Sequence, residues 1–402
     1  MELEITQKVL LYGFVLAVVM GVVVNKTNFC TMGAVSDMVN MGDKSRFRAW
    51  LFAIVISIIG VIVMEYMGLV ELDPMRPPYR AAVFDWSRYI LGGLMFGVGM
   101  TLGGGCGNKT LIRIGGGNIK SIFVLVIAAI FAYLMTKTDL YGVVFYSWMN
   151  PIAIDLAVSD IPGQDLGSLV AKAAGSTEVI NFRLIAGGLF ALLLLFYIFK
   201  SSDFFKSFDH VFGGLVVGLC VVGAWYVTGG PIGQEWLEEV EMMDQRPLGV
   251  GVQSFSFTNP MGETLDYAIN GAPSMMITFG MMALFGVIVG SFLYSVISRK
   301  FRIEWFNSFG DFINHSIGGV LMGIGGILAM GCTIGQGVTG FSTLAIGSMM
   351  AFTCFILGSA LTMKIQLYKM VYENKASFLS SLITALVDLH LLPSGMRKLE
   401  AI

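Results

Sequence analysis

Residues 92–117 read GGLMFGVGMTLGGGCGNKTLIRIGGG, an apolar stretch that glycines interrupt repeatedly and that breaks at a Gly-Cys pair. Residues 318–340 return to this pattern as GGVLMGIGGILAMGCTIGQGVTG, again with a Gly-Cys break. When Cys106 is aligned with Cys332, five glycines of the two stretches coincide at a constant offset of 226 residues. Glycine lets a backbone bend, and matched broken helices in two halves of a membrane protein indicate a substrate site near the bilayer midplane.

The composition is typical of an integral membrane protein. Of the 402 residues, 55% are hydrophobic and 13% are charged, whereas soluble domains carry about 25% charged residues. The mean hydropathy of +0.77 agrees with this class. No long basic run indicates a nucleic-acid partner. The five cysteines form no C-x-x-C pair and no zinc-ligand spacing, so we expect neither a metal site nor a cofactor.

The sequence predicts an all-α membrane protein with about nine transmembrane helices, because one span needs about 20 apolar residues. The predicted spans are residues 9–24, 50–70, 90–102, 121–135, 182–199, 210–227, 274–297, 312–329 and 341–361. Short re-entrant half-helices are expected after the first span, at residues 28–38, and at the two Gly-Cys breaks. Residues 378–392 are expected to form an interfacial helix, because Asp388 and His390 interrupt their apolar sequence.

The distribution of basic residues predicts how the chain is oriented. Sixteen of the 25 Lys and Arg residues fall in segments that the order of the spans places on one side, at 40–48, 106–120, 199–207, 298–308 and 362–402. The positive-inside rule places this side in the cytoplasm. We therefore expect the chain in the cell inner (plasma) membrane, with its N-terminus outside and its C-terminus in the cytoplasm.

In this orientation the span that ends at Cys106 descends while the span that ends at Cys332 ascends, which predicts an inverted internal repeat. Long loops at 136–181 and 229–272, the second of them acidic, lie on the outer side. The predicted divisions are a first half (1–181), a connecting fifth span (182–209), a second half (210–362) and a cytoplasmic tail or interfacial helix (363–402).

The local sequence disfavours two alternative functions, an ATPase and a soft-metal transporter. Residues 103–110, GGGCGNKT, are similar to a Walker A loop, but Asn108 stands where that motif requires Gly, and an apolar helix precedes it instead of a strand. Lys109 and Arg113 are therefore interpreted as cations near Cys106 or as ordinary positive-inside anchors. The 26 methionines are spread through apolar spans, which favours core filling over a soft-metal transport site.

The cysteines divide into two groups. Cys220 and Cys354 lie within ordinary apolar spans, where a cysteine usually acts as a small buried hydrophobe. Cys106 and Cys332 end matched half-helices, and Cys30 lies in a similar polar turn. A thiol at a backbone break lies beside unpaired N–H groups that an anion can satisfy, so these three thiols could line one path.

Four segments in both halves resemble the YeeE/YedE sulfur transport family, from about residue 10 to 362. They are NFCTMGAVSDM (28–38), GGLMFGVGMTLGGGCGNKTLIRIGGGN (92–118), FGVIVGSFLYSVISRKFRI (285–303) and GGVLMGIGGILAMGCTIGQGVTG (318–340). The resemblance implies an hourglass-like bundle of nine spans whose half-helices meet at the waist. It also implies a permease, not an enzyme, that passes thiosulfate along a narrow path by hydrogen bonds to three cysteine thiols. Lys109 departs from the family, in which small residues are common at that position, so a selenium compound stays an alternative substrate.

The candidate substrate-binding residues are the three cysteines together with nearby polar residues and glycines: Cys30, Cys106, Cys332, Asn28, Gly105, Gly331, Lys109, Arg113, Thr333 and Gln336. The expected partners are thiosulfate or a related sulfur anion, the lipid bilayer and a cytoplasmic sulfur-carrier protein. The resemblance to the family implies that neutral groups donate hydrogen bonds to the anion. The three thiols are therefore expected to stay protonated and to form no disulfide with one another. The competing class is a membrane thiol–disulfide redox protein, against which no cysteine pair is close in sequence.

Overall fold

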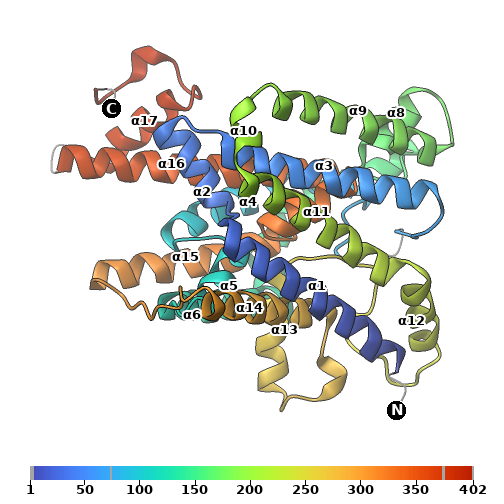
Figure 1. Cartoon of the computed structure of the whole chain (residues 1–402). Coiled ribbons are helices and arrows are strands. Elements are labelled where there is room, and N and C mark those ends of the chain that lie inside the picture. Colours follow the sequence, from blue (N-terminus) through green and yellow to red (C-terminus); the bar gives the residue numbers. More distant parts are fainter. Residues whose placement is uncertain (1–3, 73–74, 374–375, 401–402) are drawn as a thin grey trace.

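The computed structural model describes residues 4–72, 75–373 and 376–400, in which long helices run roughly side by side (Figure 1). Residues 1–3, 73–74, 374–375 and 401–402, which the predicted divisions include, lie outside the described part. Eight segments of the described chain are long and apolar enough to cross a membrane, which confirms an all-α, multi-pass membrane protein. They are α1 (Ile5–Thr27) with α2 (Thr31–Ser36) and η1 (Asp37–Met41), α3 (Ser45–Tyr66), α4 (Trp86–Leu102) with α5 (Gly107–Gly115), α6 (Ile119–Lys137), α9 (Val179–Phe199), α11 (Phe208–Gly229), α14 (Phe279–Ile297) and α16 (Ile346–Tyr372).

The span predicted at 312–329 corresponds to α15 (Phe309–Leu328), which is not among these eight. Asp311 and His315 make its first turns polar, although the helix packs along α4 and α6. The tail helix α17 (Phe378–Asp388) has 11 residues and packs on α16. A helix of that length extends about 16 Å, too short for a hydrocarbon core of about 30 Å. In Figure 1, α17 lies at the opposite end of the bundle from the start of α1.

Both broken helices end in the same way. After α4, the amide of Gly105 donates to the Met100 carbonyl at 2.8 Å, and after α15 the amide of Gly331 donates to the Gly326 carbonyl at 2.8 Å. These bonds between residues five apart, with a left-handed residue between them, define a Schellman motif. The two motifs are in register at the offset of 226 residues that the sequence predicted. The helix breaks at Cys106 and Cys332 are therefore equivalent in backbone structure.

Glycines let α4 and α15 cross with their backbones in contact. A Cβ on Gly92 would lie 2.7 Å from the Gly325 carbonyl oxygen, and a Cβ on Gly325 would lie 2.7 Å from the Gly92 carbonyl oxygen. Gly99 and Gly318 form a second reciprocal pair, at 2.9 and 2.8 Å. Such an exchange of equivalent contacts is what a twofold relation between two helices produces. Small residues permit this close approach within a membrane.

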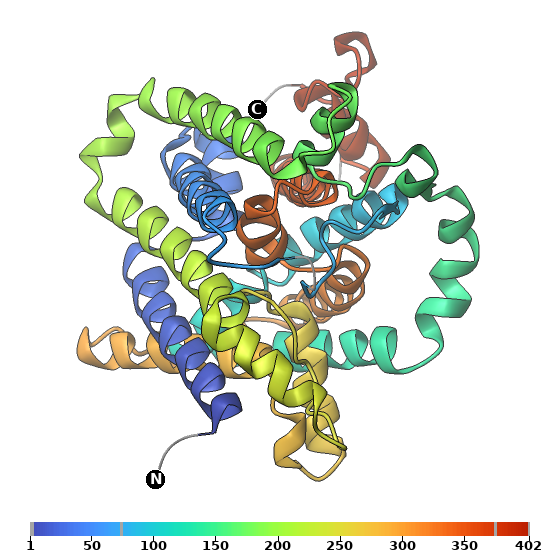
Figure 2. The same cartoon turned by 90° about the vertical axis from the view of Figure 1, so that its right-hand side faces the viewer.

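The two long connections differ from simple surface loops. The chain between α6 and α9 follows the rim of the molecule (Figure 2) and contains α8 (Leu166–Ala173) and the strand β2 (Ile154–Asp155), which pairs with β1 (Val83–Phe84). Residues 229–272 contain α12 (Pro231–Glu241) and α13 (Thr258–Ile269). Phe255, Phe257 and Thr258 of this segment are buried in the core. The prediction of one large acidic loop at 229–272 is thus wrong where α12 and α13 form, and the buried Phe255 and Phe257 anchor the chain before α13 in the core.

The last span also differs from the prediction of 341–361. Residues 341–345 form a buried turn, and α16 begins only at Ile346. The turn pairs with the chain between α6 and α9 (residues 138–178), which we call the rim segment. The amide of Leu166 donates to the Leu344 carbonyl at 3.1 Å, and the amide of Ile346 donates to the Gln164 carbonyl at 2.9 Å. The rim segment therefore fixes the turn that joins η6 (Gly335–Gly340) to α16.

Candidate functional site

The two helix breaks meet inside the bundle. Cys106 precedes α5, and Cys332 precedes the short π-helix η6 (Gly335–Gly340). A Cβ on Gly107 would lie 3.8 Å from the Cβ of Cys332, so the starts of these two segments are in contact. The Cys106 thiol faces the Thr333 hydroxyl and lies near both Cys30 and Cys332. The structure thus brings together three cysteines that are 76 to 302 residues apart in sequence, all of them buried.

Each of these cysteines precedes a short helical segment, with the amide three residues on directed at its sulfur. Gly33 donates its N–H to Cys30 Sγ at 3.4 Å, and Gly335 donates to Cys332 Sγ at 3.5 Å. The Lys109 amide is directed at Cys106 but makes no capping hydrogen bond to it. All five cysteines are free thiols. Because sulfur is the acceptor in these contacts, the thiol hydrogens stay available as weak donors.

Unpaired polar atoms gather around the cysteines. Four side-chain oxygens that follow a cysteine by one to four residues are buried without a hydrogen-bond partner in the described chain: those of Thr31, Asn108, Thr333 and Gln336. An unpaired buried polar group costs about 1–3 kcal/mol, so a polar ligand among these groups would relieve that cost. Gln336 is held by its amide nitrogen, which donates to the Ala329 carbonyl.

The predicted glycines shape this region instead of offering side chains to it. A Cβ on Gly105 would lie 2.9 Å from the Lys109 side chain, and a Cβ on Gly331 would lie 3.3 Å from Gln336. Both glycines are buried. They therefore leave space for the polar side chains that follow the two breaks.

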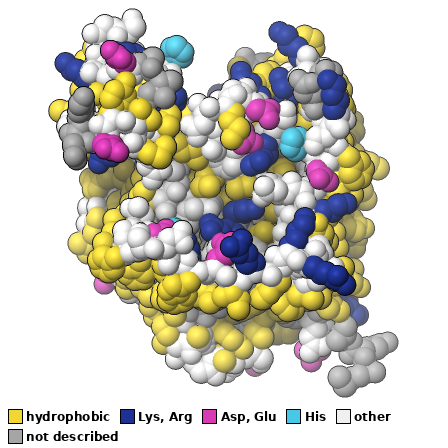
Figure 3. Space-filling model, turned by 60° about the vertical axis from the view of Figure 1, so that its left-hand side comes forward, with side chains coloured by type: hydrophobic (Ala, Val, Ile, Leu, Met, Phe, Trp, Pro, Cys, Tyr) yellow, Lys and Arg dark blue, Asp and Glu magenta, His cyan; other side chains and the backbone are white. Residues whose placement is uncertain are grey.

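Cationic side chains lie close to the segments that carry Cys30 and Cys106. Lys109 Nζ donates to Asn28 Oδ1 at 2.6 Å, which joins the start of α5 to the turn after α1. Arg113 Nη1 donates to the Gly104 carbonyl at 2.8 Å. Arg46 forms an ion pair with Asp37 at 3.2 Å, and its guanidinium lies against Gly33. Figure 3 shows Lys and Arg side chains around a hollow on one face of the molecule.

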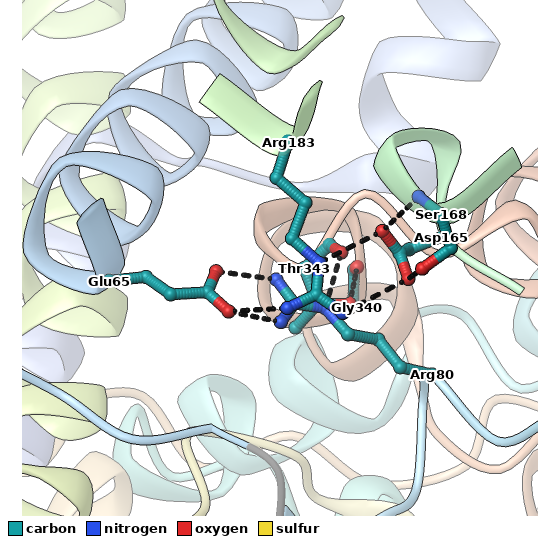
Figure 4. A network of polar contacts seen from close by, with 7 residues as sticks. All are labelled: Glu65, Arg80, Asp165, Ser168, Arg183, Gly340 and Thr343. Carbon is teal, nitrogen blue, oxygen red and sulfur yellow. Dashed lines mark hydrogen bonds and ion pairs between the residues drawn. The ribbon is translucent and has the colours of Figure 1, made fainter. Parts of the chain in front are cut away.

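A buried network of charges lies behind the second broken helix (Figure 4). Arg80 forms two hydrogen bonds with the Glu65 carboxylate, at 2.6 and 2.9 Å, and donates through Nε to the Thr343 carbonyl at 3.0 Å. Arg183 bridges Glu65, at 2.8 Å, and Asp165, at 3.0 Å. The network ties α3, α9 and the rim segment to the turn after η6. It therefore holds in place the element that carries Gln336.

Three further residues lie at the site: Thr31, Asn108 and Tyr79. Thr31 and Asn108 were detectable as the polar residues just after two of the cysteines. Tyr79 was not, because its loop has no motif. Its phenol is fully buried without a hydrogen-bond partner in the described chain and lies near Cys332. Burial raises the pKa of Tyr79 well above its ordinary value, so the phenol is a neutral donor.

Residues 26–361 match a protein family that is described as sulphur transport. The chain is similar to the thiosulfate transporter TsuA of Spirochaeta thermophila, with 24% identity over 353 residues, or 86% of this chain and 96% of that protein. It is also similar to the thiosulfate transporter TsuA of Escherichia coli, with 25% identity over 360 residues, or 87% of this chain and 92% of that protein.

Proposed function

The chain belongs to the sulphur transport family, as its motifs predicted, and from this premise we propose that it is a permease for thiosulfate or a related sulfur oxyanion. The observation that carries the proposal is the convergence of Cys30, Cys106 and Cys332 from three separate segments. Two relatives that align with most of the chain are named thiosulfate transporters. The unpaired polar oxygens around the cysteines support a polar ligand at this place.

The proposed path uses neutral donors. A dianion in the hydrocarbon region is costly, and a fixed cation at the waist would hold it too tightly, because conduction needs sites that also release. Thiols and hydroxyls donate hydrogen bonds without a charge. The path then has three weak binding sites in order: Cys332 with Tyr79, Cys106 with Thr333, and Cys30. Arg46, Lys109 and Arg113 lie close to the segments that carry Cys30 and Cys106, and they attract the anion toward the exit.

We propose that the basic exit faces the cytoplasm of the inner membrane, with the N-terminus outside. The side chains around the hollow in Figure 3 support this, because positive charge is enriched on the cytoplasmic side. The reciprocal contacts of α4 and α15 support two inverted halves that meet in an hourglass-like bundle. A cytoplasmic sulfur-carrier protein that consumes the anion at the basic hollow would keep the flow inward.

Uptake of labelled thiosulfate by proteoliposomes tests the function. Cys106→Ala should abolish uptake, whereas Cys106→Ser should retain part of it, since serine keeps a donor of similar shape. A thiol–disulfide redox protein would lose its activity in both variants. Competition by sulfite, sulfide and selenite would then identify the preferred anion. Normal import by the Ala variants of all three cysteines would refute the path.

A further inference from the structure

A cavity of about 270 Å³ lies next to the proposed path. It is bounded by the loop that carries Arg76, by the start of α13 and by the end of α15, and its lining reaches Gly331, which precedes Cys332. One water molecule needs only about 15 Å³ of such space. The cavity therefore has room for a small hydrated anion beside Gly331, the residue before Cys332.

Two side chains of opposite charge line this cavity. Arg76 is exposed on one wall and forms no ion pair with the described residues. Glu263 of α13 lies on the other wall, where its carboxylate accepts hydrogen bonds from Thr278 Oγ1 and Asn259 Nδ2, both at 2.6 Å. These partners are uncharged, so they do not neutralise Glu263.

The charged groups around Glu263 do not cancel its charge. Lys137 of α6 is the cation nearest to it, but Lys137 forms an ion pair with Asp266 at 2.8 Å. The cavity-lining residues of α15, which are Gly326 and Ile327, carry no titratable group. Thr278, which precedes α14, contributes a hydroxyl, and Arg76 lies across the cavity. An ionised Glu263 thus repels an anion in the cavity.

Protonation would reverse the role of this carboxyl group. A protonated glutamic acid carries no charge and gains an O–H donor, which can bind the anion. Burial raises the pKa of Glu263, while Thr278, Lys137 and Asn259 lower it; the net pKa is above its ordinary value. The protonated form is therefore more accessible than for an exposed glutamate.

We propose that Glu263 is an electrostatic gate at the outer cavity: a sulfur oxyanion enters the cavity and proceeds to Cys332 when Glu263 is protonated. Arg76 supplies the attraction that brings the anion in. This inference rests on the proposed permease function. It adds a residue that controls when the path admits its substrate, and it makes uptake faster at acidic external pH.

Uptake of labelled thiosulfate into proteoliposomes, measured while the external pH rises from about 5 to about 8, tests the gate. Uptake by the unmodified protein should fall across this range. Glu263→Gln should remove the pH dependence and keep the high rate, whereas Glu263→Asp should retain the dependence with a displaced midpoint. Arg76→Gln should raise the apparent KM about fivefold, the effect of roughly one charge interaction in a hydrated cavity.

Glu238→Gln, which changes an exposed acid of α12 that does not line the cavity, is the matched control and should leave the profile unchanged. A pH-independent rate for the unmodified protein, or an unchanged profile in Glu263→Gln, would overturn the gate. If Glu263→Gln does not fold, an unaltered midpoint in Glu263→Asp would overturn it equally. Loss of uptake in Cys106→Ala at every pH would show that the permease function stands independently of the gate.

Discussion

Gly104 and Met330 occupy the same position in the two helix breaks, and both have a left-handed backbone, with φ of 74° and 56°. Each lies two residues before a cysteine of the candidate site. Glycine adopts this conformation without strain, whereas another residue does so at a cost of about 1–2 kcal/mol. The second break thus carries strain that the first one avoids, directly beside Cys332.

Gly104→Ala should destabilise the protein by at least 1–2 kcal/mol, roughly the left-handed cost. A Cβ would also lie 2.6 Å from Arg113 Nη1 and displace that side chain from the Gly104 carbonyl. Thermal unfolding in detergent measures the loss. Gly188→Ala in α9 is the control, because its Cβ would meet no atom within 4 Å, and it should be neutral or stabilising. Equal unfolding temperatures for the two variants would contradict the argument.

Glu65→Gln should lower the free energy of unfolding by about 3–5 kcal/mol, because it leaves two arginines near an uncharged partner in a buried place. Arg80 and Glu65 are only 6% and 9% exposed at their side chains. Denaturation of the purified variant measures the effect. Asp160→Asn, which removes an exposed ion pair with Lys172, should cost less than about 1 kcal/mol. A small effect for both variants would show that the network is not stabilising.

The stability of the protein should fall in acid partly through Asp165. Burial raises the pKa of its carboxyl, but Arg80, Arg183 and Ser168 lower it more, and the net pKa is below its ordinary value. The stabilisation is then fully present above the unfolded pKa of about 3.9, and it is lost as the pH falls through the lower folded pKa. Asp165→Asn should be less stable at neutral pH and lose less stability on acidification. Parallel acid-unfolding curves would contradict this.

Lys109→Gln should raise the apparent KM for thiosulfate about fivefold, the size of roughly one screened charge interaction, and leave the order of preferred anions unchanged. The reason is that Lys109 lies beside the cysteines and attracts the anion without selecting among anions. Concentration-dependent uptake measures the effect. Lys172→Gln, which changes an exposed lysine of α8, is the charge-matched control. An altered anion preference in Lys109→Gln would instead make this lysine a selectivity residue.

Thiosulfate should protect the path cysteines from a small charged thiol reagent. Cys30, Cys106 and Cys332 lie beside unpaired polar groups, and the proposed path would bring a hydrated anion to them. Cys220 lies within α11 among apolar side chains and should stay unmodified with or without thiosulfate. Mass spectrometry of the labelled peptides measures each site. Equal labelling of Cys106 and Cys220, unaffected by thiosulfate, would argue against an anion path.

The sequence predicted the spanning helices and the helix breaks well, because both signals are local. Apolar runs define the spans, and the Gly-Cys pairs mark where a helix stops and a thiol follows. Residues 229–272 were predicted less well, since their acidic residues suggested a solvated loop. Phe255 and Phe257 are buried there only because other helices surround them. No local sequence pattern predicts that other helices will bury these two side chains.

The sequence by itself determined the membrane class, the equivalent breaks before Cys106 and Cys332, and the likeness to the sulphur transport family. Tertiary structure alone decided which side chains meet at these breaks. Arg80 and Arg183 reach Glu65 across 15 and 118 residues of chain, and Tyr79 meets Cys332 from a loop without a motif. Hydrophobicity and glycine spacing act along the chain, whereas charge pairing, buried hydroxyls and the cavity of Arg76 and Glu263 depend on how distant segments pack.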